Sequence, residues 1–376
     1  MLFDIRPKSR LKDLFDRERE VYELRHGLDH GEPLIIVYGI RRVGKTSLLR
    51  ACLNEFNYPY VLIDVREIYG EHGYVSKSHL YKQIARFFTS NLEFFERIGF
   101  RIRDLLSRVK VFYLSGVGIE VDTSIDVDVA SVFRVFNDWA RRHSTRFIIA
   151  FDEAQYLRFS GATRYDWIFA WAYDNLENIT IVVTGSEVGV LRDFLKLDNP
   201  EAPLYGRYVR EIVLKRFTHD QSRVFLERGF SELGIRVYSD EIDEAIGKLD
   251  GIPGWLTLYG YYRGVQRLDH RTALDKVFEM GSKLVIEELE KIIAPSRQRY
   301  LAILEAIVHG ATRWTEIKAY TEYRTGARIA DKNFTDLLGK LVKYGVVEKH
   351  DNKYRIIDPL VEHAIRSITT KHKIHR

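Results

Sequence analysis

Short apolar runs alternate along the first 216 residues with longer stretches in which apolar side chains recur at helical spacing. We interpret each run as apolar throughout and not alternating, which is typical of strands covered on both faces. They lie at 34–38, 60–65, 147–151, 179–183 and 209–214. Strands separated by helices in this way predict an α/β fold with a parallel five-stranded sheet.

The segment 109–129, between the second and third predicted strands, departs from this pattern. Its residues alternate in polarity around central glycines. This alternation predicts a β-hairpin inserted on the α/β frame.

After residue 216 the spacing becomes helical, with one break at 251–254. From residue 296 onward, helices predicted at 297–308, 315–320 and 329–344 precede two short strands joined by a turn at Asp351 and Asn352. That order is the outline of a winged helix-turn-helix. We therefore expect three parts: an α/β domain at 1–216, a helical lid at 217–295 and a winged helix at 296–376.

The composition is that of a folded protein, because 45% of the residues are hydrophobic and 30% are charged. The longest apolar runs are far shorter than the ~20 residues that cross a bilayer, so we expect no membrane span. The single cysteine, Cys52, cannot close an intrachain disulfide, and the first residues are charged where a signal peptide would be apolar. These features predict a cytoplasmic protein, and the scarcity of Gln and Asn favours a thermophilic source.

The strongest chemical signal follows the first predicted strand. The segment Gly39–Thr46 reads GIRRVGKT, a complete phosphate loop of the form G-x-x-x-x-G-K-[ST]. Its glycines let backbone N–H groups point at phosphate oxygens, Lys45 supplies a point charge, and Thr46 supplies a hydroxyl for Mg²⁺. The predicted nucleotide contacts are Gly39, Ile40, Arg41, Arg42, Val43, Gly44, Lys45, Thr46 and Ser47.

Two carboxylates follow the third predicted strand. Asp152 at the strand end can hold Mg²⁺, and Glu153 can take a proton from the water that attacks the γ-phosphate. An acidic pair that caps a helix is the simpler alternative. With the phosphate loop upstream, the pair favours hydrolysis of a nucleoside triphosphate.

Hydroxyl and cationic side chains follow further along the chain. Thr184 and Ser186 come at the end of the fourth predicted strand, where either could orient the water or touch the γ-phosphate, although Ser186 could equally cap the next helix. Arg207 precedes the fifth strand, and an arginine at the cleft could neutralise charge in the transition state. We expect it to act on the nucleotide of its own chain, with action on a neighbouring chain as the alternative.

These motifs together resemble the archaeal P-loop ATPases of the STAND branch, within the AAA+-related NTPases. The resemblance rests on the phosphate loop, DEAQ at 152–155, TGS at 184–186, LYGR at 204–207 and the Gly-x-Pro segment at 251–253. It covers the whole chain and implies a five-stranded ASCE-type sheet, ATP as the nucleotide and slow, switch-like hydrolysis.

The same resemblance implies roles for individual residues. Lys45 and Thr46 bind the phosphates and Mg²⁺, Asp152 binds Mg²⁺, Glu153 acts on the water, Thr184 or Ser186 is the first sensor, and Arg207 reads the γ-phosphate. Pro253 contacts the adenine side from the lid. The family's Gly-Arg-x-x-Glu segment reads Asp16-Arg17-Glu18-Arg19-Glu20 here, so Asp16 replaces the glycine and Arg17 is the residue expected to approach the nucleotide.

Positive charge is concentrated in the C-terminal part. Residues 296–376 carry a net +7, which leaves −2 for residues 1–295. A winged helix with this charge could bind duplex DNA through phosphate contacts. The cations predicted to read DNA are Arg328, Lys332, Lys340 and Lys343 with Asn333 on the third helix, and Lys349, Lys353 and Arg355 on the wing. A protein partner, or packing against the ATPase part, is the alternative, because this fold does not determine function.

We therefore expect an Mg²⁺-dependent ATPase whose nucleotide state rearranges its lid and winged helix. The alternative is a nucleotide-gated scaffold or regulator with negligible turnover. Either could be a monomer or a nucleotide-dependent oligomer. A P-loop kinase is disfavoured because no acceptor site is evident, and GTP is disfavoured because Asn352-Lys353 lacks the aspartate of a guanine-reading motif.

Overall fold

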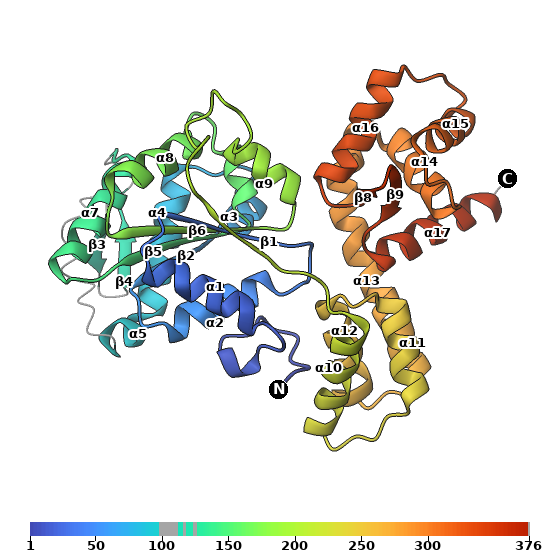
Figure 1. Cartoon of the computed structure of the whole chain (residues 1–376), viewed down its shortest axis with the longest axis horizontal. Coiled ribbons are helices and arrows are strands. Elements are labelled where there is room, and N and C mark those ends of the chain that lie inside the picture. The colour runs from blue at the N-terminus through green and yellow to red at the C-terminus, as the bar shows by residue number, and fades with distance from the viewer. Residues whose placement is uncertain (98–111, 116–117, 123–125, 375–376) are drawn as a thin grey trace.

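A parallel five-stranded sheet forms the centre of the N-terminal part (Figure 1). The computed structural model describes residues 1–97, 112–115, 118–122 and 126–374. The strands are, in spatial order, β2 (Tyr60–Asp64), β5 (Phe147–Asp152), β6 (Ile179–Gly185), β1 (Leu34–Tyr38) and β7 (Arg210–Val213). The α/β sheet predicted from the apolar runs is confirmed, and strand ends differ from the predicted ones by one or two residues.

Helices cover both faces of the sheet. Ile35 and Val37 of β1 enter the core that the sheet shares with α1 (Glu18–Asp29) and α2 (Lys45–Glu55). Leu34 and Ile36 enter the core on the opposite face. That face is covered by α3 (Val65–His72), α4 (Lys77–Ser90), α5 (Leu92–Arg97), α7 (Val129–Arg142), α8 (Tyr165–Asn175) and α9 (Val188–Leu195).

The edge strand β7 departs from the prediction that every strand is covered on both faces. Ile212 is buried, but its neighbours Glu211 and Val213 are exposed. The expectation of a continuous buried strand is therefore wrong for β7, because it is an edge strand, with β1 as its one neighbour among the described strands of the sheet.

A small antiparallel hairpin lies beside the sheet, within the segment where an inserted hairpin was predicted. It consists of β3 (Phe112–Ser115) and β4 (Gly118–Val121). It packs on α4, where the amide of Ile119 donates to Thr89 Oγ1 over 3.1 Å. Within the predicted segment, residues 109–111, 116–117 and 123–125 lie outside the described residues.

The second half of the chain is helical until residue 347. Its helices are α10 (His219–Glu232), α11 (Ser239–Leu249), α12 (Pro253–Gly260), the π-helical turn η3 (Tyr261–Val265), α13 (His270–Ile293), α14 (Arg297–Val308), α15 (Trp314–Thr325) and α16 (Asp331–Lys343). The hairpin β8 (Val347–His350) and β9 (Lys353–Ile356) and the helix α17 (Pro359–Ile374) follow. The predicted winged helix is confirmed. Helix α17 was not predicted, and short 3₁₀ turns occur at Leu11–Asp13, Ala154–Phe159 and Ala294–Ser296.

The 24-residue helix α13 joins the lid to the winged helix. It packs on α12 at one side and on α17 at another, where a Cβ on Gly281 would lie 1.9 Å from Leu360. One apolar cluster continues through both parts and also includes Leu2 and Phe3 from the start of the chain. The boundaries at 216 and 295 stay predictions. No described helix combines the length and apolar character that crossing a bilayer requires.

Candidate active site

The phosphate loop connects the end of β1 to the start of α2. Gly44 has φ of 101°, a left-handed conformation that glycine adopts without steric cost. At Gly39 the limit is space, because a Cβ would lie 2.7 Å from Val43 and 2.8 Å from the carbonyl oxygen of Leu214. Gly44 is therefore required by the backbone conformation of the loop, and Gly39 by the close approach of Val43 and of the chain at Leu214.

Lys45 is buried within the loop that it terminates. Its Nζ donates to the carbonyl oxygens of Gly39 at 2.9 Å and Ile40 at 3.0 Å. Burial lowers the pKa of Lys45, while the carboxylates of Glu153 and Asp152 oppose this shift. The loop thus holds a cation beside the two carboxylates, as the motif predicts.

Two hydroxyl groups converge on Asp152 at the carboxyl edge of the sheet. Thr46 Oγ1 donates to Oδ2 at 2.8 Å, and Thr184 Oγ1 donates to Oδ1 at 2.5 Å. Burial raises the pKa of Asp152, and the hydrogen bond from Thr184 opposes that shift. A hydroxyl and a carboxylate oxygen side by side fit Mg²⁺, which usually takes one or two protein ligands and completes its shell with water and phosphate.

Glu153 follows in a left-handed backbone conformation with φ of 54°. Its Oε2 accepts from Ser186 Oγ at 2.6 Å and from Gln155 Nε2 at 2.5 Å. Although burial raises the pKa of Glu153, the charge of Lys45 and the bond from Ser186 outweigh it and lower the value. The group is therefore held as a carboxylate, the form that can accept a proton.

A cleft of about 510 Å³ opens in front of the loop. This size suits a cofactor-sized ligand. The phosphate loop, the first 17 residues and the lid line most of the cleft, and α3 and the end of β5 contribute one residue each. Its lining includes Lys8, Phe15, Arg17, Arg41, Lys45, Thr46, Ser47, Arg66, Glu153, Phe217, Pro253, Gly254, Trp255 and Glu288.

Arg17 lies at this cleft and braces the loop. Its Nη2 donates to the carbonyl oxygens of Val43 at 3.3 Å and Lys215 at 2.8 Å, and its guanidinium lies over the ring of Phe217. Asp16, which stands where the resembling family has glycine, has φ of 52°. This left-handed backbone conformation explains why the family has glycine at the position. Aspartate adopts the conformation more readily than most other residues do. A direct contact of Arg17 with nucleotide stays a prediction.

The lid touches the phosphate loop beside Pro253. The amide of Gly254 donates to the carbonyl oxygen of Arg42 at 2.9 Å, and the Arg42 guanidinium lies 4.3 Å from the ring centroid of Trp255. A Cβ on Gly254 would lie 2.7 Å from that of Arg42. The contact of Pro253 with adenine stays a prediction.

Arg207 lies away from this cleft. It forms a bidentate ion pair with Asp174, at 2.7 and 3.0 Å, near the end of α8. Asp174 precedes β6 and Arg207 precedes β7, so both lie at the amino edge of the sheet, opposite the phosphate loop. A five-residue strand separates the two edges by roughly 16 Å. The prediction that Arg207 acts within its own cleft is therefore wrong, and its action on a neighbouring chain stays a prediction.

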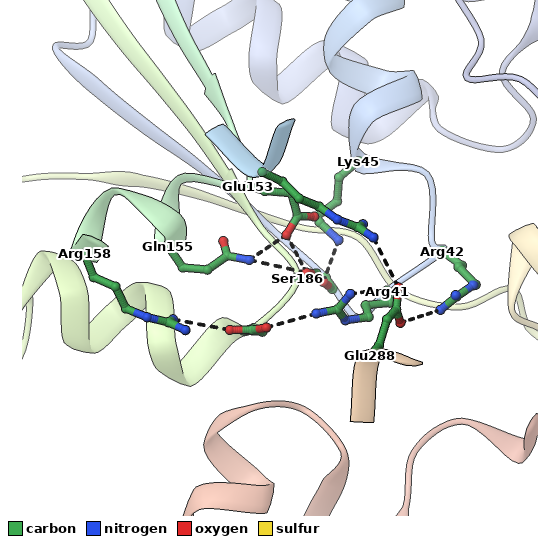
Figure 2. A network of polar contacts seen from close by, with 11 residues as sticks. Arg41, Arg42, Lys45, Glu153, Gln155, Arg158, Ser186 and Glu288 are labelled. Atoms are coloured by element: carbon green, nitrogen blue, oxygen red, sulfur yellow. Dashed lines mark hydrogen bonds and ion pairs between the residues drawn. The ribbon is translucent and has the colours of Figure 1, made fainter. Parts of the chain in front are cut away.

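Sequence reasoning missed several partners of the site (Figure 2). Glu187 and Glu288 pair with Arg41, and Gln155 holds Glu153. Gln155 belongs to the DEAQ segment and Glu187 directly follows TGS, so local motifs pointed toward both. Glu288 lies more than 240 residues from the loop and carries no local signal.

The winged helix packs against the ATPase part beside α9 and the end of β6. Lys343, at the end of α16, pairs with Asp193 of α9. The Arg158 guanidinium lies 5.7 Å from the ring of Tyr344, and a Cβ on Gly345 would lie 3.6 Å from the carbonyl oxygen of Ser186. Part of the predicted DNA-reading helix is thus covered. Arg328, placed on that helix by the sequence, precedes it.

Comparisons with known proteins agree with this geometry. Residues 14–258 match ATPase_2, an ATPase domain predominantly from Archaea, and residues 295–357 match the C-terminal winged helix-turn-helix domain of MCM proteins. The Walker-type ATPase PABY2304 of Pyrococcus abyssi is 40% identical over 97% of this chain and 100% of its own, with a TM-score of 0.84.

The ORC2 protein of Aeropyrum pernix, solved in ADPNP–ADP complexes, shares the fold at 13% identity over 98% of each chain and a TM-score of 0.58. No curated protein matches the chain. Membership of the STAND branch stays a prediction. The ATPase_2 model matches well over half of this sequence, and the Pyrococcus protein matches nearly all of it. The chain therefore belongs to the ATPase_2 family of P-loop ATPases found predominantly in Archaea.

Proposed function

We propose that this ATPase uses Mg²⁺ and that its nucleotide state moves the lid and winged helix relative to the sheet. Thr46 and Asp152 would hold the ion, which would neutralise phosphate charge. Lys45 binds the phosphates, and Glu153 accepts the proton of the attacking water, with Ser186 and Gln155 orienting its carboxylate. Thr184 joins Asp152 to the backbone of Glu153, since its hydroxyl accepts from the Glu153 amide at 3.0 Å.

A continuous set of contacts from the phosphate loop to the winged helix carries this proposal. Arg42 of the loop contacts Gly254 and Trp255 of the lid. Trp255 Nε1 in turn donates to both carboxylate oxygens of Asp358, at 3.0 and 3.1 Å. Asp358 precedes α17 and also accepts from the amide of Leu360 at 2.9 Å. Trp255 of the lid therefore contacts both the phosphate loop and the winged helix. A shift of the loop on binding phosphate moves Trp255 and, through it, the winged helix.

We expect the distance between α4 and α15 to change by several ångströms between ADP and ATP. Spin labels at Lys82→Cys and Tyr323→Cys would report it, because both positions are exposed and the native Cys52 is fully buried. A Glu153→Gln background keeps ATP intact during the measurement. The Trp255→Phe variant keeps an aromatic ring for Arg42 but loses the bond to Asp358, so it should reduce the change. Identical distance distributions in ADP and ATP would refute the proposed movement.

DNA binding by the winged helix is a second proposal, favoured by four exposed lysines. Lys332 and Lys340 lie on α16, and Lys349 and Lys353 lie on the hairpin. Lys343 and Arg355 are instead paired, with Asp193 and Glu348.

Replacing both Lys332 and Lys340 with Ala should weaken binding to duplex DNA and reduce the slope of log K against log salt by about 2. Fluorescence anisotropy at several salt concentrations measures this, with Lys82→Ala on α4 as the control. Absence of duplex binding at low salt would instead favour a protein partner for this surface.

Light scattering with and without ATP would show whether the chain is a monomer or a nucleotide-dependent oligomer.

A further inference from the structure

Arg41 of the phosphate loop is held by two carboxylates that lie outside the loop (Figure 2). Its Nη2 lies 2.9 Å from Oε1 of Glu187, which precedes α9. Its Nη1 lies 3.0 Å from Oε1 of Glu288, on α13. A single side chain that lines the cleft thus joins the loop to the segment before α9 and to α13, the helix that leads into the winged helix.

Each carboxylate that holds Arg41 also pairs with other arginines. Glu288 is shared by Arg41, Arg42 and Arg66, with nitrogen–oxygen distances of 3.0, 3.3 and 3.4 Å. Glu187 is shared by Arg41 and Arg158. Four guanidinium groups therefore share two carboxylates, and three of the four line the cleft. Arginine side chains at this position suit a phosphate ligand, because the planar guanidinium offers several N–H donors that match phosphate oxygens.

Arg41 lies at the end of the cleft where the γ-phosphate is expected. Although burial opposes it, the carboxylates of Glu288, Glu153 and Glu187 raise the pKa of Arg41. The geometry agrees: Glu187 lies 2.9 Å from Arg41, and the residue before it, Ser186, donates to Glu153 Oε2 at 2.6 Å. Because Glu153 is the proposed base for the attacking water, the Arg41 guanidinium lies near the expected position of the terminal phosphate.

We propose that Arg41 binds the γ-phosphate of the ATP in its own cleft and releases Glu288 when it does so. This inference rests on the proposed nucleotide switch and deepens it. It assigns to Arg41 the role in its own chain that Arg207 does not fill. Glu288 and the γ-phosphate compete for one guanidinium, so ATP weakens a contact between the loop and α13 that ADP leaves intact.

The test is the ratio of ATP to ADP affinity, measured by calorimetry in a Glu153→Gln background. Arg41→Gln should lower ATP affinity about 10-fold, the size of one charged hydrogen bond, and change ADP affinity less than about 2-fold. Glu288→Gln should raise ATP affinity, because the competing carboxylate charge is gone. This gain should vanish in the Arg41→Gln/Glu288→Gln double variant. Arg158→Gln is the matched control, since Arg158 shares Glu187 but does not line the cleft, and its ratio should stay unchanged.

Equal losses of ATP and ADP affinity in Arg41→Gln would overturn the inference, as would a Glu288→Gln gain that persists without Arg41. Arg41→Lys keeps the charge and should retain part of the discrimination, which separates loss of the cation from misfolding. The distance measurement between α4 and α15 in the same variants separates the two proposals. A normal ATP-dependent movement with an unchanged affinity ratio would reject Arg41 and leave the switch standing. An altered ratio without movement would support Arg41 and reject the switch.

Discussion

Replacing Glu153 with Gln is expected to lower ATP turnover by about 10²- to 10⁴-fold while ATP remains bound. Gln has nearly the same shape but cannot accept the proton of the attacking water. The side chain is positioned by Ser186 and Gln155, so its place in the site should persist. Phosphate release in a single-turnover assay measures the loss, and calorimetry measures the retained affinity.

Glu211→Gln is the matched control for this experiment, because Glu211 is an exposed carboxylate on the edge strand β7. Its turnover should equal that of the parent. If Glu153→Gln hydrolyses ATP at the parental rate, Glu153 is not the base. That result would support the alternative that the acidic pair only caps a helix. If the parent itself shows negligible turnover, the protein is better described as a nucleotide-gated scaffold.

Replacing Lys45 with Ala is expected to weaken ATP binding by about 100-fold. The variant loses the buried ammonium that lies beside Glu153 and Asp152, and the carbonyl groups of Gly39 and Ile40 lose their donor. Calorimetric titration with ATP measures the change, and Lys82→Ala on α4 controls for the loss of a lysine charge elsewhere. An unchanged thermal unfolding midpoint would show that the loop still folds. ATP affinity equal to that of the parent would mean that the loop is only a structural turn.

The local chemistry of the site was predictable because its motifs are short. The phosphate loop is eight residues long, and its glycines meet steric conditions that arise within the loop and its adjoining strands, as at Gly39 and Gly44. The proximity of Thr46 to Asp152, across 106 residues, also followed from sequence. Both residues lie at the carboxyl edge of a parallel sheet, where ligands bind.

The error at Arg207 shows where such reasoning failed. A residue that precedes a parallel strand lies at the amino edge of the sheet, away from the ligand. The loop before β7 is held at that edge by the ion pair between Arg207 and Asp174 of α8. Glu187 and Arg41 come together only because β6 and β1 are neighbours in the sheet. Strand order does not follow from the periodicity of each strand.

The class of fold, the phosphate loop, the acidic pair and the presence of a winged helix could all be predicted from the amino-acid sequence, because periodicity and motif spacing act over a few residues. Three features emerged only from the tertiary structure: Arg207 lies away from the cleft, Glu288 of α13 pairs with Arg41 of the loop, and the winged helix packs against α9. The contacts of Glu288 and of the winged helix with the ATPase part join residues at least 150 positions apart, as Lys343 and Asp193 show, and their geometry depends on how α13 and α17 pack together.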